Sequence, residues 1–296
     1  MRIVTAAGLL ALVAGIGVGR ADEQVFGYVR GAESLPRGAS EIVQTLTLRT
    51  DKGQGTYEAL DSKTEYERGI TDRLTAGFAL KMMAIETRGL LINAYIPKDE
   101  QYDLKPSGVE GELKYNFLSP AKDPIGLAAL LSLDYAWLDP HSGQDKDTLS
   151  LELDLLAQKY FLDGQLIWVG NAGVESTYAH RDDVADLPPD FEWPTEPEME
   201  IELKVGTGLS YRFAPNWFIG AEALYETEFE TEVGQERWSV FAGPSLHYAS
   251  GHWWATLAWF PQLEGGGEFY EGQSDRSLHL IEKTEQEFRV KLGYAF

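Results

Sequence analysis

Apolar and polar side chains alternate along most of the chain beyond residue 39. In the stretch 198–213, for example, Met199 and Ile201 share one phase, whereas Glu200 and Glu202 share the other. Successive side chains of a β-strand point to opposite faces, so this period of two residues predicts strands with one apolar face. Twelve segments show the pattern, near residues 40–50, 56–69, 74–85, 108–117, 125–138, 148–160, 165–178, 198–213, 217–230, 237–248, 253–263 and 282–296.

The alternation by itself fits two all-β architectures. In a soluble sandwich the apolar faces cover a core, whereas in a membrane barrel they face lipid and the polar faces line the lumen. The connections alternate between short turns, such as 163–164 and 214–216, and longer polar loops, such as 179–197. This rhythm is typical of transmembrane barrels. We therefore expect a single up-and-down antiparallel transmembrane β-barrel of about 12 strands, with both termini periplasmic.

The first 21 residues have the features of a secretory signal peptide. Arg2 supplies a basic start, residues 3–18 form a short apolar stretch, and Gly19-Arg20-Ala21 fits the small-x-small cleavage pattern. An uncleaved membrane anchor is the alternative, but the apolar stretch is short for a membrane span. We expect three regions: the signal peptide, 1–21; a periplasmic N-terminal segment, 22–39, forming a short strand or a plug; and the barrel, 40–296.

The composition narrows the partners and the chemistry. The formal net charge is −22, and removal of the two arginines of the signal peptide makes it −24. Such acidity argues against nucleic acid as a partner, because phosphates attract clustered basic residues. Without cysteine the chain has no disulfide, no thiolate metal site and no heme-attachment motif. The five histidines are scattered and no phosphate-binding loop is present, so we expect no cofactor and assign no metal site.

The C-terminal residues carry the most specific pattern. Apolar side chains occupy alternate positions and the chain ends on an aromatic residue; these positions are Phe288, Val290, Leu292, Tyr294 and Phe296. The pattern resembles the terminal strand of bacterial outer-membrane barrels, in which a final Phe acts as the membrane-insertion signal. The resemblance implies a Gram-negative outer membrane as the location. It also implies membrane lipid and the outer-membrane assembly machinery as partners.

Several turn and strand-end motifs point in the same direction. They are Phe-Gly-Tyr at 26–28, Leu-Pro-Arg-Gly at 35–38, and the stretches 65–74, 118–127 and 158–163. Together they resemble an uncharacterised family of Gram-negative outer-membrane barrels. That resemblance implies the barrel fold, but it implies no activity and no ligand, so no functional residue is carried over from it.

The polar phase of the expected strands is rich in acidic residues, with about two acids for each base. Pairing 217–230 with 198–213 across the turn between them places Glu202 opposite Glu228 and Glu200 opposite Glu230. Like charges in these positions need a cation, a proton or neighbouring bases. We therefore predict that these four glutamates bind or pass cations near the outer mouth. The expected lumen charge cluster comprises Glu200, Glu202, Lys204, Arg212, Glu222, Glu226, Glu228 and Glu230.

A hydrolase is a weaker reading of the same sequence. Ser245 and His247 lie two residues apart on one expected strand, as the serine and histidine of outer-membrane lipases do, but in reversed order. Glu222 is expected near His247 across the hairpin, where it would orient the ring. A serine–histidine pair alone is weak evidence for nucleophilic catalysis, and a structural pairing of His247 with Glu222 explains it equally well.

These observations lead to three functional hypotheses in a fixed order. The first is a narrow channel or uptake protein for small solutes, with small cations preferred, because acidic linings concentrate cations. The second is a closed structural or surface-interaction barrel that acts through acidic extracellular loops. The third is an outer-membrane hydrolase; without a second catalytic feature we expect no enzyme and name no catalytic residue.

Overall fold

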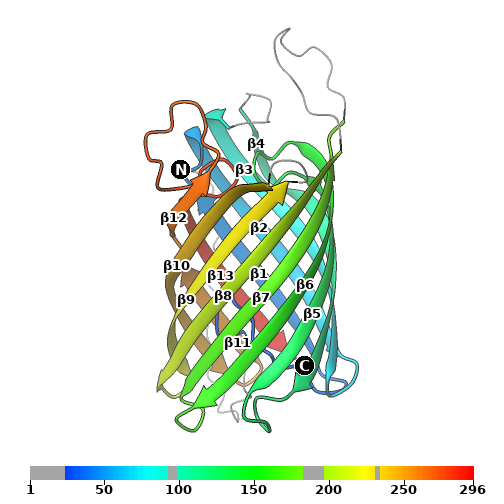
Figure 1. The fold of residues 1–296 in the computed structure, drawn as a ribbon. Coiled ribbons are helices and arrows are strands. Elements are labelled where there is room, and N and C mark those ends of the chain that lie inside the picture. Colours follow the sequence, from blue (N-terminus) through cyan, green and yellow to red (C-terminus); the bar gives the residue numbers. More distant parts are fainter. Residues whose placement is uncertain (1–23, 93–98, 183–196, 231–233) are drawn as a thin grey trace.

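The structure is a computed structural model that describes residues 24–92, 99–182, 197–230 and 234–296. The expected signal peptide therefore lies outside the described residues. Thirteen strands form one antiparallel sheet that curls into a barrel (Figure 1). They are β1 (Ser40–Thr50), β2 (Gln54–Gly69), β3 (Leu74–Leu91), β4 (Gln101–Leu118), β5 (Gly126–Leu138), β6 (Asp145–Phe161), β7 (Leu166–His180), β8 (Glu198–Ala214), β9 (Trp217–Glu230), β10 (Gly234–Ser250), β11 (Trp253–Trp259), β12 (Gln262–Gly267) and β13 (Gln286–Ala295).

Each strand pairs with its neighbour in the sequence, and β13 pairs with β1 to close the sheet. β11 and β12 both pair with β10 and occupy one position in the wall, so the barrel has twelve positions. The predicted all-β, up-and-down barrel is thus confirmed. Ser40 and Phe296 hydrogen bond to each other at the rim that carries the short turns, here called the short-turn rim. The opposite end is called the long-loop rim.

The eleventh strand differs from its prediction. The sequence predicts one strand over 253–263, whereas the structure breaks it between Trp259 and Gln262. Pro261 has no N–H to donate to the sheet, and the register with β10 shifts nearby, between Val240 and Phe241. The break turns Phe260 into the lumen, where it is 1% exposed.

Strand lengths also differ at the long-loop rim. β3 and β4 continue beyond the predicted ends at 85 and 108, so part of the expected loop between them is strand. Their pairing contains register shifts near Met82 and Met83, which allow the ladder to pass Pro106. Conversely, residues 282–285 were predicted to begin the last strand but precede β13 as an inward-folded segment.

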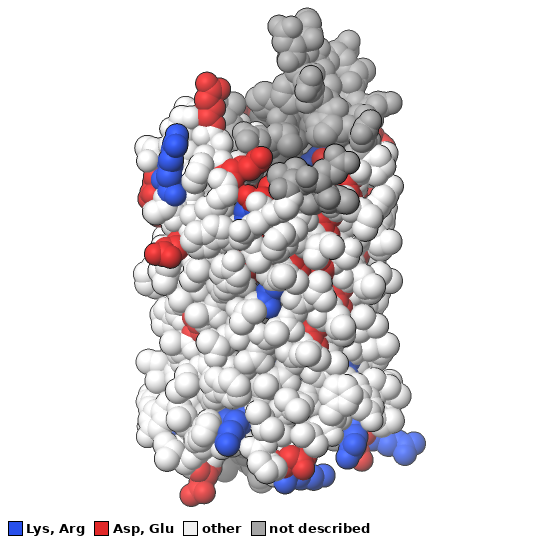
Figure 2. All heavy atoms as spheres, in the orientation of Figure 1, with Lys and Arg blue, Asp and Glu red and all other residues white. Residues whose placement is uncertain are grey.

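The two faces of the wall have opposite chemistry. Outward positions such as Leu153 and Val205 are 46% and 57% exposed, although they are apolar. Inward positions carry charges and are mostly buried inside the barrel, as Glu112 and Glu228 are. Figure 2 shows most of the visible charged side chains at the two rims, with few on the wall between them. Because a wall of this kind is stable only where lipid covers it, the barrel is built to sit in a membrane.

Within the described residues, no helix is long and apolar enough to cross a membrane.

Candidate functional site

A polar cavity of about 470 Å³ lies inside the barrel. Its wall comes from strands all round the sheet, including β2, β4, β6 and β8. Gly27, Tyr28 and Arg30 of the N-terminal segment line its floor, on the side of the short-turn rim. His141 and Lys283 from two loops line its roof, on the side of the long-loop rim. We call this cavity the chamber.

The floor of the chamber is built by residues 24–39. No strand forms here; the segment rises from the short-turn rim, where Gln24 accepts from Thr256, and returns to it, where Leu35 donates to Thr75. Phe26 is fully buried among apolar side chains of β7. The prediction left a short strand and a plug as alternatives for this region, and residues 24–39 adopt the inward-folded arrangement.

One carboxylate holds the top of this segment. Glu222 of β9, 3% exposed, accepts backbone hydrogen bonds from Gly27 at 2.8 Å, Tyr28 at 2.7 Å and Val29 at 3.0 Å. Three successive N–H groups converging on one anion form a favourable concave site for negative charge. A side chain at position 27 would collide with Ala258, so the glycine permits this close approach. Glu222 therefore serves as an anchor for the floor.

Tyr28 adds a second anchor. Its ring stacks on Phe260 with centroids 4.0 Å apart, and the guanidinium of Arg289 lies 3.8 Å from its other contact. The hydroxyl donates to Glu287 at 2.9 Å. Burial, reinforced by the charge of Glu287, raises the pKa of Tyr28 well above its ordinary value, so the phenol keeps its proton and its role as donor.

Arg30 ties the segment to the opposite wall. Its guanidinium donates to both oxygens of Glu112, at 3.0 and 2.9 Å, a paired geometry that is strong and directional. Asn171 accepts from the Arg30 N–H and donates to its carbonyl oxygen. The surrounding acids, with Glu112 the largest contribution, outweigh burial and raise the pKa of Arg30. The floor is thus fixed on two sides of the barrel.

The roof is formed by the segment between β12 and β13, which folds inward. Lys52, 2% exposed, donates to the carbonyl oxygen of Glu282 and lies 3.0 Å from Nδ1 of His141. His279 is fully buried and its N–H donates to Gln262. Burial and the nearby Lys52 lower the pKa of His141, and burial lowers that of His279 to about 3. Both rings are therefore neutral at ordinary pH.

The predicted pairing of the acidic strands is confirmed. Glu200 lies opposite Glu230, Glu202 opposite Glu228, and Lys204 opposite Glu226. Two bases that the sequence analysis did not include complete the cluster. Lys283 from the roof lies 3.2 Å from Glu202 and 2.7 Å from Glu226. Arg237 of β10 pairs with several acids: Glu228 at 2.6 Å, Glu236 at 2.8 Å, Glu282 at 3.0 Å and Glu200 at 3.8 Å.

The remaining members of the expected cluster lie apart. Lys204 contacts Glu152 at 2.9 Å and Glu175 at 2.6 Å, so it links β8 to β6 and β7. Arg212 is exposed near the short-turn rim and joins none of these contacts. Glu222 anchors the floor instead. Lys283 was missed because it lies in an expected strand at 282–296, where alternation gives no indication of an inward fold.

The expected orientation of His247 by Glu222 is wrong. Glu222 lies opposite Gly243, and His247 lies opposite Phe218. His247 Nδ1 instead lies 2.7 Å from the hydroxyl of Thr256. Ser245 Oγ is buried without a hydrogen-bond partner, so the two residues do not form a nucleophile–base pair in this arrangement.

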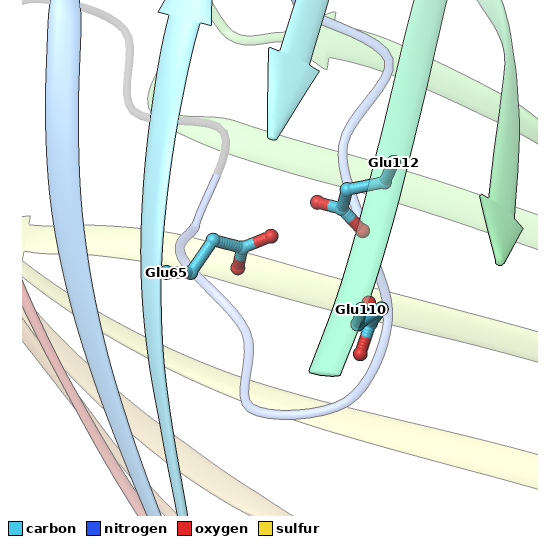
Figure 3. A group of neighbouring side chains, drawn as sticks. All are labelled: Glu65, Glu110 and Glu112. Carbon is cyan, nitrogen blue, oxygen red and sulfur yellow. The ribbon is translucent and has the colours of Figure 1, made fainter. Parts of the chain in front are cut away.

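A second acidic group was not singled out by the sequence. Glu65 of β2 and Glu110 and Glu112 of β4 place carboxylate oxygens within 4.8 Å of one another. Figure 3 shows Glu65 and Glu112 directed toward each other beside the N-terminal segment. The intervening strand β3 contributes Gly77 and Ala79 at these levels, so nothing bulky separates the acids. Only the register of three strands brings them together.

The C-terminal strand closes the wall. Its apolar residues point outward, with Phe288 at 45% and Phe296 at 56% exposure. β13 pairs with β1 on one side and with β11 on the other. Its inward residue Gly293 makes room for Trp254, whose ring would collide with any side chain there.

A family model described as a family of unknown function (DUF6662) matches residues 18–296. The chain belongs to this family. No curated protein matched the chain significantly. Among solved structures, the COG4313 outer membrane channel from Pseudomonas putida F1 is similar, with a TM-score of 0.62 and 12% identity over 95% of this chain and 100% of that chain. The translocator domain of the autotransporter NalP from Neisseria meningitidis gives a TM-score of 0.54 and 15% identity over 88% and 90%. At these identities the similarity establishes the barrel fold of this DUF6662 member.

Proposed function

We propose that the protein is a narrow channel of the Gram-negative outer membrane that passes small solutes and favours cations. The observation that carries this proposal is the polar chamber inside a closed barrel with an apolar outer wall. A purely structural barrel of this width needs no polar cavity of this size, because side chains alone can fill the interior. A solute path runs through the chamber when the floor or the roof yields.

The lining of the chamber supports a preference for cations. Among the described residues it carries ten acidic and seven basic side chains, so negative charge is in excess. The excess is smaller than two to one, since Arg30, Lys146 and Lys283 lie outside the predicted strands and turn inward. Uncompensated carboxylates in a low-dielectric channel raise the local concentration of cations.

Ion selectivity in a planar bilayer tests the proposal. With a salt gradient across the membrane, the protein should show a reversal potential that indicates cation preference. Combining Glu202→Gln with Glu228→Gln should shift that potential toward zero by removing two lining charges. The matched control is Glu264→Gln, at an exposed position that does not line the chamber. Stable channels with unchanged selectivity in the double variant would contradict the cation preference.

A closed barrel is the second candidate, favoured by the number of contacts that hold the floor and roof in place. Folded, heat-modifiable protein that shows no conductance would support it. The acidic loop expected to act at the cell surface falls largely on residues 183–196, outside the described residues. The outer-membrane location, and recognition of the final strand by the assembly machinery, belong to the same proposal and rest on the outward apolar residues of β13.

A further inference from the structure

We propose that Glu65, Glu110 and Glu112 form a divalent-cation site, and that a bound cation competes with Arg30 for Glu112. The site would take a hard cation such as calcium. Because Arg30 belongs to the floor of the chamber, binding at this site would loosen one of the floor's two polar anchors. The inference concerns binding and does not depend on whether the barrel conducts.

The geometry suits one ion held by three carboxylates. One oxygen from each residue lies within 4.8 Å of the other two. Calcium binds oxygen at about 2.3–2.6 Å, so two ligands of the same ion are separated by up to about 5 Å. The three oxygens can therefore reach one ion with small side-chain adjustments. Figure 3 shows the space between Glu65 and Glu112 toward which both carboxylates point.

A buried oxygen without a partner points independently to a missing ligand. Glu65 is 5% exposed, and its Oε1 makes no hydrogen bond. The other contact of this carboxylate is Lys63, 3.6 Å from Oε2, which is too long for a hydrogen bond. A buried carboxylate oxygen left unpaired is costly, and a cation between Glu65 and Glu112 would remove that cost.

Charge balance gives the reason for competition with Arg30. Three carboxylates meet two basic side chains here: Lys63, 2.7 Å from Glu110, and Arg30, 2.9 Å from Glu112. The directly contacting charges therefore leave one negative charge uncompensated. Replacing Arg30 by a divalent cation balances the group. Arg30 lies on a segment without strand hydrogen bonds, so it is the base that can leave more easily than Lys63 of β2.

The surroundings provide access and room. Glu65, Glu110, Lys63 and Arg30 all line the chamber, so an ion and its waters can arrive from there. A side chain at Gly77 would approach Glu112 Cγ at 2.9 Å and Glu65 Oε1 at 3.2 Å, so the glycine keeps the space between the acids open.

The ligand set selects the class of ion. It consists of carboxylate oxygens alone, with no imidazole or thiolate among them. Oxygen-only sites favour calcium, magnesium and manganese over zinc and copper. Calcium fits best among these, because magnesium demands shorter distances and a stricter octahedral geometry.

Calorimetric titration of the purified, chelator-treated full-length barrel with calcium chloride tests the inference. The wild type should bind calcium, and Glu65→Gln and Glu110→Gln should each weaken binding by at least about tenfold, as loss of a direct ligand does. Arg30→Gln should strengthen binding, since it removes the competing charge. Glu152→Gln, a lumen glutamate that pairs with Lys204 outside this group, is the matched control and should leave the affinity unchanged.

The outcomes separate the alternatives. A purely structural ion-pair cluster predicts no calcium binding by the wild type or by Arg30→Gln, and that result would overturn the proposal. Equal affinity in the wild type and Glu65→Gln, with heat-modifiable folding intact, would also overturn it. Absence of conductance in bilayers would instead refute the channel and leave this site standing.

Discussion

At the scale of single residues, the decisive groups are those that connect the barrel wall to segments that are not strands. Glu222 accepts three backbone hydrogen bonds, Arg30 pairs with Glu112, and Lys283 inserts between Glu202 and Glu226. Their phase along the strands indicated only that Glu222, Glu202 and Glu226 face inward. Which partner each one meets was not predictable, because the partners come from segments without periodicity.

Replacement of Glu222 should loosen the floor of the chamber. In Glu222→Ala, three adjacent amides lose their common acceptor in a buried position, at a cost of about 1–3 kcal/mol to the docked segment. Hydrogen exchange at Gly27, Tyr28 and Val29 should become faster. The comparison is Glu264→Ala, an exposed glutamate, which should leave that exchange unchanged. Undiminished protection in Glu222→Ala would show that the other anchors suffice.

At the scale of elements, regular strands were well predicted and their interruptions were not. The bounds of β1 and β9 match the alternation, whereas the break at Pro261 and the inward fold of residues 282–285 do not. Alternation reports which face a side chain occupies when a strand continues, but it does not report where the chain leaves the wall. The roof of the chamber arises from such a departure.

Acidification should loosen the roof. The pKa of buried His279 is about 3, below its value of about 6.5 in an undocked loop, so the undocked state binds more protons between these two pH values. Roof stability is therefore complete above about pH 6.5 and falls by up to about 1.4 kcal/mol per pH unit below it.

Proteolytic cleavage within the segment 268–281 as a function of pH measures this effect. Cleavage should accelerate as the pH falls from 7 to 5, and His279→Gln should show a weaker dependence. His252→Gln, at an exposed turn of the opposite rim, should behave as the wild type does. An identical pH profile in His279→Gln would assign the effect to another group.

At the scale of the whole molecule, stability depends on lipid covering the outer wall and on charge balance within. The apolar phase makes a soluble state of the same barrel unfavourable, because dozens of large apolar side chains would face water. The interior has no apolar core of comparable extent; ion pairs and the N-terminal segment occupy it instead.

A charge on the outer wall should therefore be more damaging than a cavity there. Leu153→Arg, near the centre of β6, should destabilise the folded barrel by about 2–4 kcal/mol, the depth-dependent cost of arginine facing lipid. Leu153→Ala at the same site should cost less. Urea unfolding in phospholipid vesicles gives both values, and equal losses would indicate that this face does not contact the hydrocarbon region.

The sequence by itself determined the strand number, the antiparallel order, the inward and outward faces, and the pairing of β8 with β9. These follow from local alternation and short turns, which depend only on neighbouring residues. Only the tertiary structure decided that residues 24–39 fill one half of the lumen, that Lys283 enters the acidic cluster, and that Glu65 meets Glu110 and Glu112. Each of these depends on closure of the barrel, which brings together residues far apart in the sequence and leaves no periodic trace in it.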